Sequence, residues 1–131
     1  MNNDDNNENS LSHRRKERIF FLYRNYLLDD SKEEIESDQF NFNKKQIDFI
    51  NLILKDIDSL ENKIKKFIPS DWIWERFNFL EKAILLNAAS EMILKKKDKK
   101  IIINESVEFA KKYCTEKAAP LINAILDKIG T

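Results

Sequence analysis

Glycine and proline are almost missing from this chain, whose 131 residues include one glycine and two prolines. The tight turns of a β protein depend on both residue types, so their scarcity argues against a fold built from hairpins. Leucine, isoleucine, lysine and glutamate dominate instead. We therefore expect an all-α fold, and the length suits one domain with a substantial core.

Cysteine and histidine each occur once, as Cys114 and His13. One cysteine cannot form an internal disulfide, and together the two residues cannot provide the ligands of a zinc site. The sequence also lacks a glycine-rich phosphate loop, a nucleophile beside a histidine and an acidic cluster at metal-ligand spacing. These absences predict a protein that is not an enzyme and that uses no metal and no other cofactor.

An excess of charge of either sign is absent, because 23 basic residues balance 23 acidic ones. Any attraction to nucleic acid must therefore come from local clusters of charge. Long hydrophobic runs are absent too, since none approaches the roughly 20 residues that span a bilayer. The chain starts with polar and acidic residues where a signal peptide would be basic and then apolar. We expect a soluble, cytoplasmic protein that is not exported, and a lone cysteine suits that reducing setting.

The apolar residues that are present recur three and four positions apart, which is the spacing of buried helix faces. Helices are predicted over about 12–28, 44–67 and 77–94, after residue 98, and over about 118–129. Ser12 and Asp98 are expected N-caps, Ser70 or Asp71 is expected to cap a short turn with Trp72 and Trp74, and Pro69 and Gly130 are expected to end helices. Without sustained heptads or an internal repeat, these helices predict a compact bundle.

Two polar segments fall outside this pattern. Residues 1–10 are expected to be a disordered polar tail, which leaves 11–131 as the single folded domain. Residues 29–43 are acidic, and their only large apolar side chains are Ile35, Phe40 and Phe42. This second segment predicts a connection with at most one short helix.

Basic and aromatic residues come together in the segment SHRRKERIFFLY, residues 12–23. On a helix, Arg14, Arg18 and Phe21 fall on one side, facing away from the expected buried stripe. Arginine contacts phosphates, and both arginine and an exposed aromatic ring stack on bases, so this face suits single-stranded RNA. The alternative is a solvated helix start, with Phe21 buried against the acidic connection.

Two further groups of charged residues allow more than one interpretation. The lysine-rich cluster KKKDKK, residues 95–100, either adds positive potential near a helix end or forms a soluble loop. Glu75, Arg76, Glu81 and Lys82 stand at the start of a predicted helix, where acidic side chains interact favourably with the helix dipole. That effect explains Glu75 without any partner.

Three segments carry a family resemblance. They are RRKERIFFLY at residues 14–23, FNFLEKAILLNAASEMI at 77–93, and INESVEFAKKY followed by LINAILDKI between Ile103 and Ile129. In order and spacing they resemble the NusB family. That family combines a basic helix ending in Leu-Tyr, a Glu-Lys/Arg-Ala-Ile-Leu helix with a later Glu, an Ile-Asn-Glu-Ala-Val-Glu-Leu-Ala-Lys helix and a closing Val-Asn-Gly-Val-Leu-Asp.

The resemblance implies an all-α bundle of about six to seven helices in two packed helical subdomains. It also implies a transcription antitermination factor that binds boxA-type RNA together with the ribosomal protein NusE. In the family, the basic first helix and the start of the last helix meet the RNA, while the helix with the Glu-Lys-Ala motif meets the protein partner.

By position, the resemblance and the basic first helix together indicate two surfaces. The RNA candidates are Arg14, Arg15, Lys16, Arg18, Phe21, Tyr23 and Lys117, with the 116–121 segment. The candidates for contact with the protein partner are Glu75, Arg76, Glu81 and Lys82.

The chain departs from the family pattern at the start of its last helix. Ala118, Ala119, Pro120 and Leu121 stand where the family usually has a Ser-His-Lys-Phe run. The change removes a cation and an aromatic ring from the expected RNA surface, for which Lys117 is a partial substitute. A helical protein-protein interaction module that has lost RNA binding is therefore the alternative function. The sequence does not decide between a monomer and a homodimer.

Overall fold

Six α-helices and one short 3-10 helix make up the computed structural model, which describes residues 8–28 and 42–129. They are α1 (Glu8–Leu28), α2 (Lys44–Lys55), α3 (Ile57–Lys65), the 3-10 helix η2 (Trp74–Arg76), α4 (Phe79–Ile93), α5 (Lys99–Tyr113) and α6 (Ala118–Ile129). No strand occurs within these two ranges. The predicted all-α fold is therefore confirmed.

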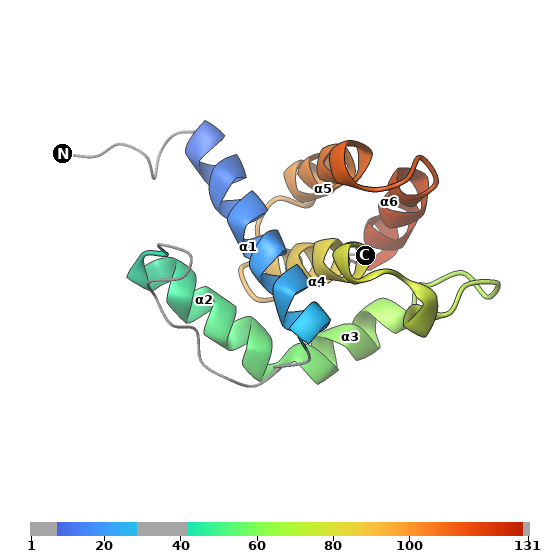
Figure 1. Ribbon diagram of the computed structural model, residues 1–131, viewed down its shortest axis with the longest axis horizontal. Helices are drawn as coiled ribbons and strands as arrows, with labels where there is room; N and C mark the ends of the chain where they lie inside the picture. The colour runs from blue at the N-terminus through green and yellow to red at the C-terminus, as the bar shows by residue number, and fades with distance from the viewer. Residues whose placement is uncertain (1–7, 29–41, 130–131) are drawn as a thin grey trace.

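Helix α4 lies at the centre of the bundle and packs against α1, α3, α5 and α6 (Figure 1). All residues from 83 to 91 are buried, and Ala88 and Ala89 are 0% exposed. Their small side chains allow α1 to pack along α4, and these two helices make the most extensive pair in the fold. A helix that is buried on every side belongs to the core, so α4 positions the helices around it.

Side chains close to the helix starts fix where three of the helices begin. Asn43 Oδ1 accepts a hydrogen bond from Gln46 N at 2.9 Å, and Gln46 Oε1 accepts one from Asn43 N at 3.0 Å. Asn78 and Glu81 form the same reciprocal capping box at the start of α4. Asp98 Oδ1 accepts a backbone hydrogen bond at 2.9 Å, which confirms it as the N-cap of α5. Each such cap stabilises its helix by about 1 kcal/mol.

Two predicted helices have different bounds in the structure. Helix α1 begins at Glu8 and not at Ser12, so residues 8–10 belong to a helix and not to a tail. The predicted helix 44–67 is two helices, because Asp56 leaves helical angles at φ −102° and ψ 14°. The second of the two ends at Lys65, before Pro69.

The segment before α4 also differs from the expectation. The 3-10 helix η2 follows Ile73 and has no side-chain cap, so neither Ser70 nor Asp71 caps it. Helix α4 starts two residues after Phe77. Helix α6, by contrast, has the predicted bounds, with Pro120 in its first turn, where a missing N–H donor costs nothing.

Several expectations concern residues outside the described ranges. These are the tail at residues 1–7, the connection at 29–41 with Ile35 and Phe40, and the helix stop at Gly130. Of the helices that the structure does describe, none is both long and apolar enough to cross a membrane.

Candidate functional site

Arg15 and Arg18 lie inside the molecule, where they share one buried carboxylate. Arg15 donates to Glu91 through Nε at 2.7 Å and through Nη2 at 2.8 Å, and Nη1 donates to Glu105 Oε1 at 3.2 Å. Arg18 Nη2 lies 3.1 Å from Glu91 Oε2, and Arg18 Nε donates to Asn87 Oδ1. Both arginines are 8% exposed and Glu91 is 1% exposed. These groups form a buried ion cluster that fastens α1 to α4.

The two arginines of this cluster lower the pKa of Glu91. Burial raises the pKa of a carboxyl group, but the hydrogen bonds from Arg15 and the charge of Arg18 outweigh that effect and hold the pKa of Glu91 below its usual value. A further hydrogen bond, from Asn87 Nδ2 at 2.9 Å, acts in the same direction. Glu91 is therefore ionised at neutral pH, and it neutralises part of the charge of both arginines.

The predicted outward orientation of Arg18 and Phe21 is wrong. Arg18 is turned toward α4 by Glu91 and Asn87. Phe21 is 6% exposed, and its ring lies edge-on to Phe42 with 6.1 Å between centroids. The alternative given for Phe21 placed it in the interior, which agrees with its burial against Phe42, a residue of the connection that the structure describes. Helix α1 is packed on more than one side, so a single buried stripe does not describe it.

Lys16 belongs to a partly exposed aromatic patch between α1 and α5, made up of Lys16, Phe20, Phe109, Lys112 and Tyr113. The Phe20 centroid lies 5.4 Å from that of Phe109 and 5.3 Å from that of Tyr113. Lys16 Nζ lies 5.5 Å and Lys112 Nζ 5.4 Å from the centre of the Tyr113 ring. Interaction with Lys16, and more weakly with Lys112, lowers the pKa of the Tyr113 hydroxyl.

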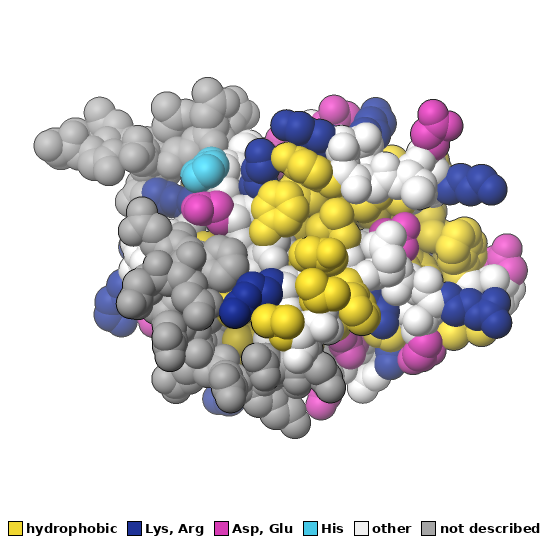
Figure 2. All heavy atoms as spheres, viewed as in Figure 1, with side chains coloured by type: hydrophobic (Ala, Val, Ile, Leu, Met, Phe, Trp, Pro, Cys, Tyr) yellow, Lys and Arg dark blue, Asp and Glu magenta, His cyan; other side chains and the backbone are white. Residues whose placement is uncertain are grey.

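Sequence reasoning missed four of these five residues, although a signal was present. Lys16 and Phe20 are four residues apart, as are Phe109 and Tyr113, so each pair occupies one face of its helix. On the face that Figure 2 shows, hydrophobic side chains gather over α1, α5 and the start of α4, with lysines and arginines beside them. Two cations next to a cluster of aromatic rings are suited to phosphates and bases.

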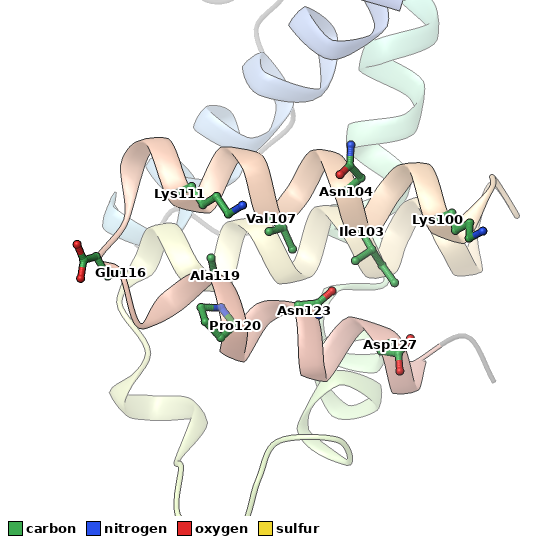
Figure 3. Close-up of a pocket in the computed structure, with 10 residues that line it drawn as sticks. All are labelled: Lys100, Ile103, Asn104, Val107, Lys111, Glu116, Ala119, Pro120, Asn123 and Asp127. Carbon is green, nitrogen blue, oxygen red and sulfur yellow. The ribbon is translucent and has the colours of Figure 1, made fainter.

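The start of α6 borders a groove of about 810 Å³ between α5 and α6 (Figure 3). Ile103 and Val107 of α5 face Pro120 and Asn123 of α6 across it. Each end of the groove carries one lysine and one acidic residue, which are Lys111 with Glu116 and Lys100 with Asp127. The groove therefore has no excess of positive charge for a phosphate. Lys117 is exposed just before α6.

The four residues assigned to a protein partner lie around the start of α4. Glu75 and Arg76 are exposed in η2, while Glu81 and Lys82 are partly exposed in the first turn of α4. Lys82 Nζ lies 5.3 Å from the centre of the Trp74 ring, so its side chain spans the gap between the two elements.

Exposed hydrophobic side chains flank this group. Trp72 is 41% exposed, Ile73 48% and Phe79 39%. The Phe79 ring is stacked on that of Tyr26 with 6.2 Å between centroids, and Tyr26 donates from its hydroxyl to Glu61 Oε2 at 2.6 Å. Apolar side chains among scattered charges are typical of a protein-binding surface.

A family model described as the NusB family matches residues 9–131 of this chain. The chain belongs to the NusB family. The transcription antitermination protein NusB of Sulfurovum sp. is 38% identical to it over 104 residues, which cover 76% of this chain and 78% of that protein. The protein of the same name from Campylobacter hominis is 32% identical over 99 residues, with 76% and 72% covered.

Similarity to a solved NusB structure agrees with this assignment. The structure of T. maritima NusB superposes with a TM-score of 0.73 at 20% sequence identity, and the match covers 91% of this chain and 89% of that one. The NusB fold is therefore confirmed. NusB proteins are non-catalytic factors, so membership of the family also confirms that this chain is not an enzyme. Within the described ranges, no group of three His, Cys, Asp or Glu residues could hold a metal ion.

Proposed function

We propose that this NusB-family chain is a transcription antitermination factor of the cytoplasm, a non-catalytic adaptor that binds boxA-type RNA together with the ribosomal protein NusE. The observation that carries the proposal is the family match, which extends over residues 9–131 and so includes both predicted surfaces. The relatives described above carry the name transcription antitermination protein.

The RNA-binding surface in this proposal is the aromatic patch together with Lys117, and Arg14 is a further cation on another side of α1. Lys16 of α1 and Lys112 of α5 both approach the ring of Tyr113. The repulsion between their two positive charges is reduced when a phosphate lies between them. Phe20 and Tyr113 are partly exposed and offer ring faces on which bases can stack. Arg15 and Arg18 act indirectly, because their ion pairs with Glu91 hold α1 in place.

The protein-binding surface in this proposal is the group around the start of α4. Glu81 Oε1 accepts the hydrogen bond from Asn78 N that caps α4, so the same carboxylate that fixes the helix start also faces solvent in part. Glu75 and Arg76 add one charge of each sign. A partner with exposed apolar side chains and both signs of charge fits this surface, and NusE is the partner that the family implies.

One set of observations favours the competing function, a helical interaction module that has lost RNA binding. Two of the expected RNA-contacting arginines are buried, and Ala118, Ala119 and Pro120 replace polar residues. The two functions make different predictions for the same titration, since only the first requires measurable affinity for RNA.

A fluorescence-anisotropy titration of boxA-type RNA, with and without purified NusE, tests the proposal. The double variant Lys16→Ala/Lys112→Ala is expected to bind RNA more weakly and with a salt-dependence slope reduced by about 0.7, which is the contribution of the one phosphate held between the two lysines. The matched control is Lys63→Ala/Lys65→Ala, which removes the same charge from exposed positions of α3.

Three results can be distinguished in this titration. A reduced slope for the patch variant alone supports the RNA surface. Equal affinity and slope for both variants and the unmodified chain reject this surface, even if RNA binds. No RNA binding with or without NusE, accompanied by binding of NusE alone, favours the competing function.

A further inference from the structure

A second basic region lies on another side of α1, in a cleft of about 360 Å³ between α1, the start of α2 and the connection from α4 to α5. Of the lining residues that the structure describes, six are cationic and one, Glu91, is a carboxylate; the six are Arg14, Arg15, Arg18, Lys45, Lys95 and Lys97. Two of the lysines come from the 95–100 cluster, whose role the sequence left open. Three separate segments thus bring positive charge to one place.

Among the residues that the structure describes, the cationic side chains that line this cleft outnumber the carboxylates. Glu91 is already engaged by Arg15 and Arg18, and Glu105 by Arg15, so among the described residues these carboxylates offset only part of the charge of the three lysines. Burial lowers the pKa of Lys97, and the nearby charges of Arg18 and Arg15 lower it further against the opposing effect of Glu91. An anion in the cleft would relieve this repulsion.

Gln46 provides a hydrogen-bond donor in the lining of the cleft. Its Oε1 is fixed by the hydrogen bond from Asn43 N, which also fixes the orientation of the amide. Its Nε2 is buried and finds no acceptor among the described residues, while the whole side chain is 8% exposed. An unsatisfied buried donor is costly and uncommon in proteins, so its presence calls for an acceptor.

The start of α2 adds a further preference for an anion. Gln46 is the third residue of this 12-residue helix, and no acidic residue occurs in the first turn of α2. The N–H groups at a helix N-terminus and the positive end of its dipole attract anions. The cleft therefore combines lysines, a helix start and an amide donor, which are the groups that bind phosphate.

We propose that this cleft binds a phosphate group of the RNA backbone, with Gln46, Lys45, Lys95 and Lys97 as its contacts. The inference rests on the proposed function, because it supplies that RNA with a second point of attachment. Residues 14 and 16 are about 200° apart around the axis of α1. The cleft and the aromatic patch therefore lie on different sides of one helix, and the RNA crosses the start of α1 to reach both.

Gln46→Glu is the most selective variant for testing this cleft. It keeps the oxygen that accepts the Asn43 hydrogen bond and replaces the NH₂ donor with a second carboxylate oxygen, so the cap of α2 survives. We expect an unchanged or higher melting temperature, because a carboxylate suits a helix start among cations. We also expect RNA affinity to fall at least tenfold at low salt, because a donor to phosphate becomes a negative charge.

A charge-removal variant provides an independent measurement. Lys45→Ala/Lys95→Ala/Lys97→Ala is expected to lower the salt-dependence slope of RNA binding by about 0.7, which is the contribution of the one phosphate held in the cleft. Lys63→Ala/Lys65→Ala/Lys66→Ala is the matched control, since it removes the same charge from exposed positions at the end of α3. This control is expected to leave the affinity within about twofold.

Pyrophosphate is a probe that distinguishes binding in the cleft from binding at the rest of the RNA site. Added to the chain, it is expected to shift the NMR signals of the Gln46 side-chain amide and to compete with RNA. If RNA binds the unmodified chain and both cleft variants equally well, the cleft proposal is overturned while the proposed function stands. If pyrophosphate shifts the Gln46 amide and RNA does not bind with or without NusE, RNA is ruled out as the source of the phosphate and the proposed function fails as well.

Discussion

Replacement of Glu91 by glutamine is the sharpest test of how α1 is held in this fold. The side chain is 1% exposed and serves as the common acceptor for Arg15, Arg18 and Asn87. Glu91→Gln keeps the shape of the side chain and removes its charge, leaving two buried guanidinium groups that cannot lose their protons. Breaking a buried ion pair on one side costs about 3 to 5 kcal/mol.

That loss is large compared with the stability of a whole domain, which is about 5 to 15 kcal/mol. Urea denaturation followed by circular dichroism at 222 nm measures it, and the midpoint should move to clearly lower urea with little change in slope. Glu108→Gln is the matched control, because Glu108 pairs with Lys111 at 3.3 Å on the surface, where both side chains are about 60% exposed. The control should change the free energy of unfolding by less than about 0.5 kcal/mol.

The effect of Glu91→Gln on the free energy of unfolding should depend on pH in a defined direction. The pKa of Glu91 in the folded chain lies below its ordinary value of 4.5. Its stabilising contribution is therefore complete above pH 4.5 and is lost as the pH falls through the lowered pKa of the folded state. The difference between the unmodified chain and Glu91→Gln should shrink in acid. A difference under about 1 kcal/mol at pH 7, or one that grows in acid, would refute the assigned role.

Three further predictions concern packing, capping and cysteine chemistry. Ile125→Ala should lower the free energy of unfolding by about 2 to 5 kcal/mol, because Ile125 is 0% exposed, and a loss under about 0.5 kcal/mol would mean that α6 is not packed as described. Asn78→Ala should cost about 1 kcal/mol in the same assay by removing the capping box of α4, and no loss would show that the box is not needed. Burial, together with the charge of Glu81, raises the pKa of the Cys114 thiol from 9.0 to about 11, so at pH 8 iodoacetamide should modify the folded chain about a hundredfold more slowly than the urea-unfolded chain, and equal rates would contradict this.

The helices could be predicted largely because their boundaries depend on residues that are close together in the sequence. Asp98 caps α5 and Pro120 falls in the first turn of α6, and both features depend only on neighbours in the chain. The break at Asp56 was invisible to the apolar pattern, because one non-helical residue leaves the spacing between Ile53, Ile57 and Leu60 unchanged. All three of these residues are buried as the pattern predicts, although they belong to two helices.

The site was predicted less well than the helices, because it depends on contacts between distant segments. Nothing near Arg18 in the sequence indicates that Glu91 will bury it, since the two residues meet only when α1 packs on α4. The aromatic patch was missed for the same reason, because Phe20 of α1 contacts Phe109 of α5 only in the folded chain. Charged residues on an amphipathic helix are ordinarily assigned to solvent, and a buried ion cluster reverses that assignment.

The burial of α4 on all sides has a consequence for genetics. Substitutions at Ala88 or Ala89 have no space to occupy, so they would remove activity by lowering the amount of folded protein and not by altering a binding contact. A random screen for loss of function would therefore recover many alleles in this one segment. Such alleles should be temperature-sensitive and poorly accumulated, whereas alleles at the surface lysines should yield normal amounts of an inactive protein.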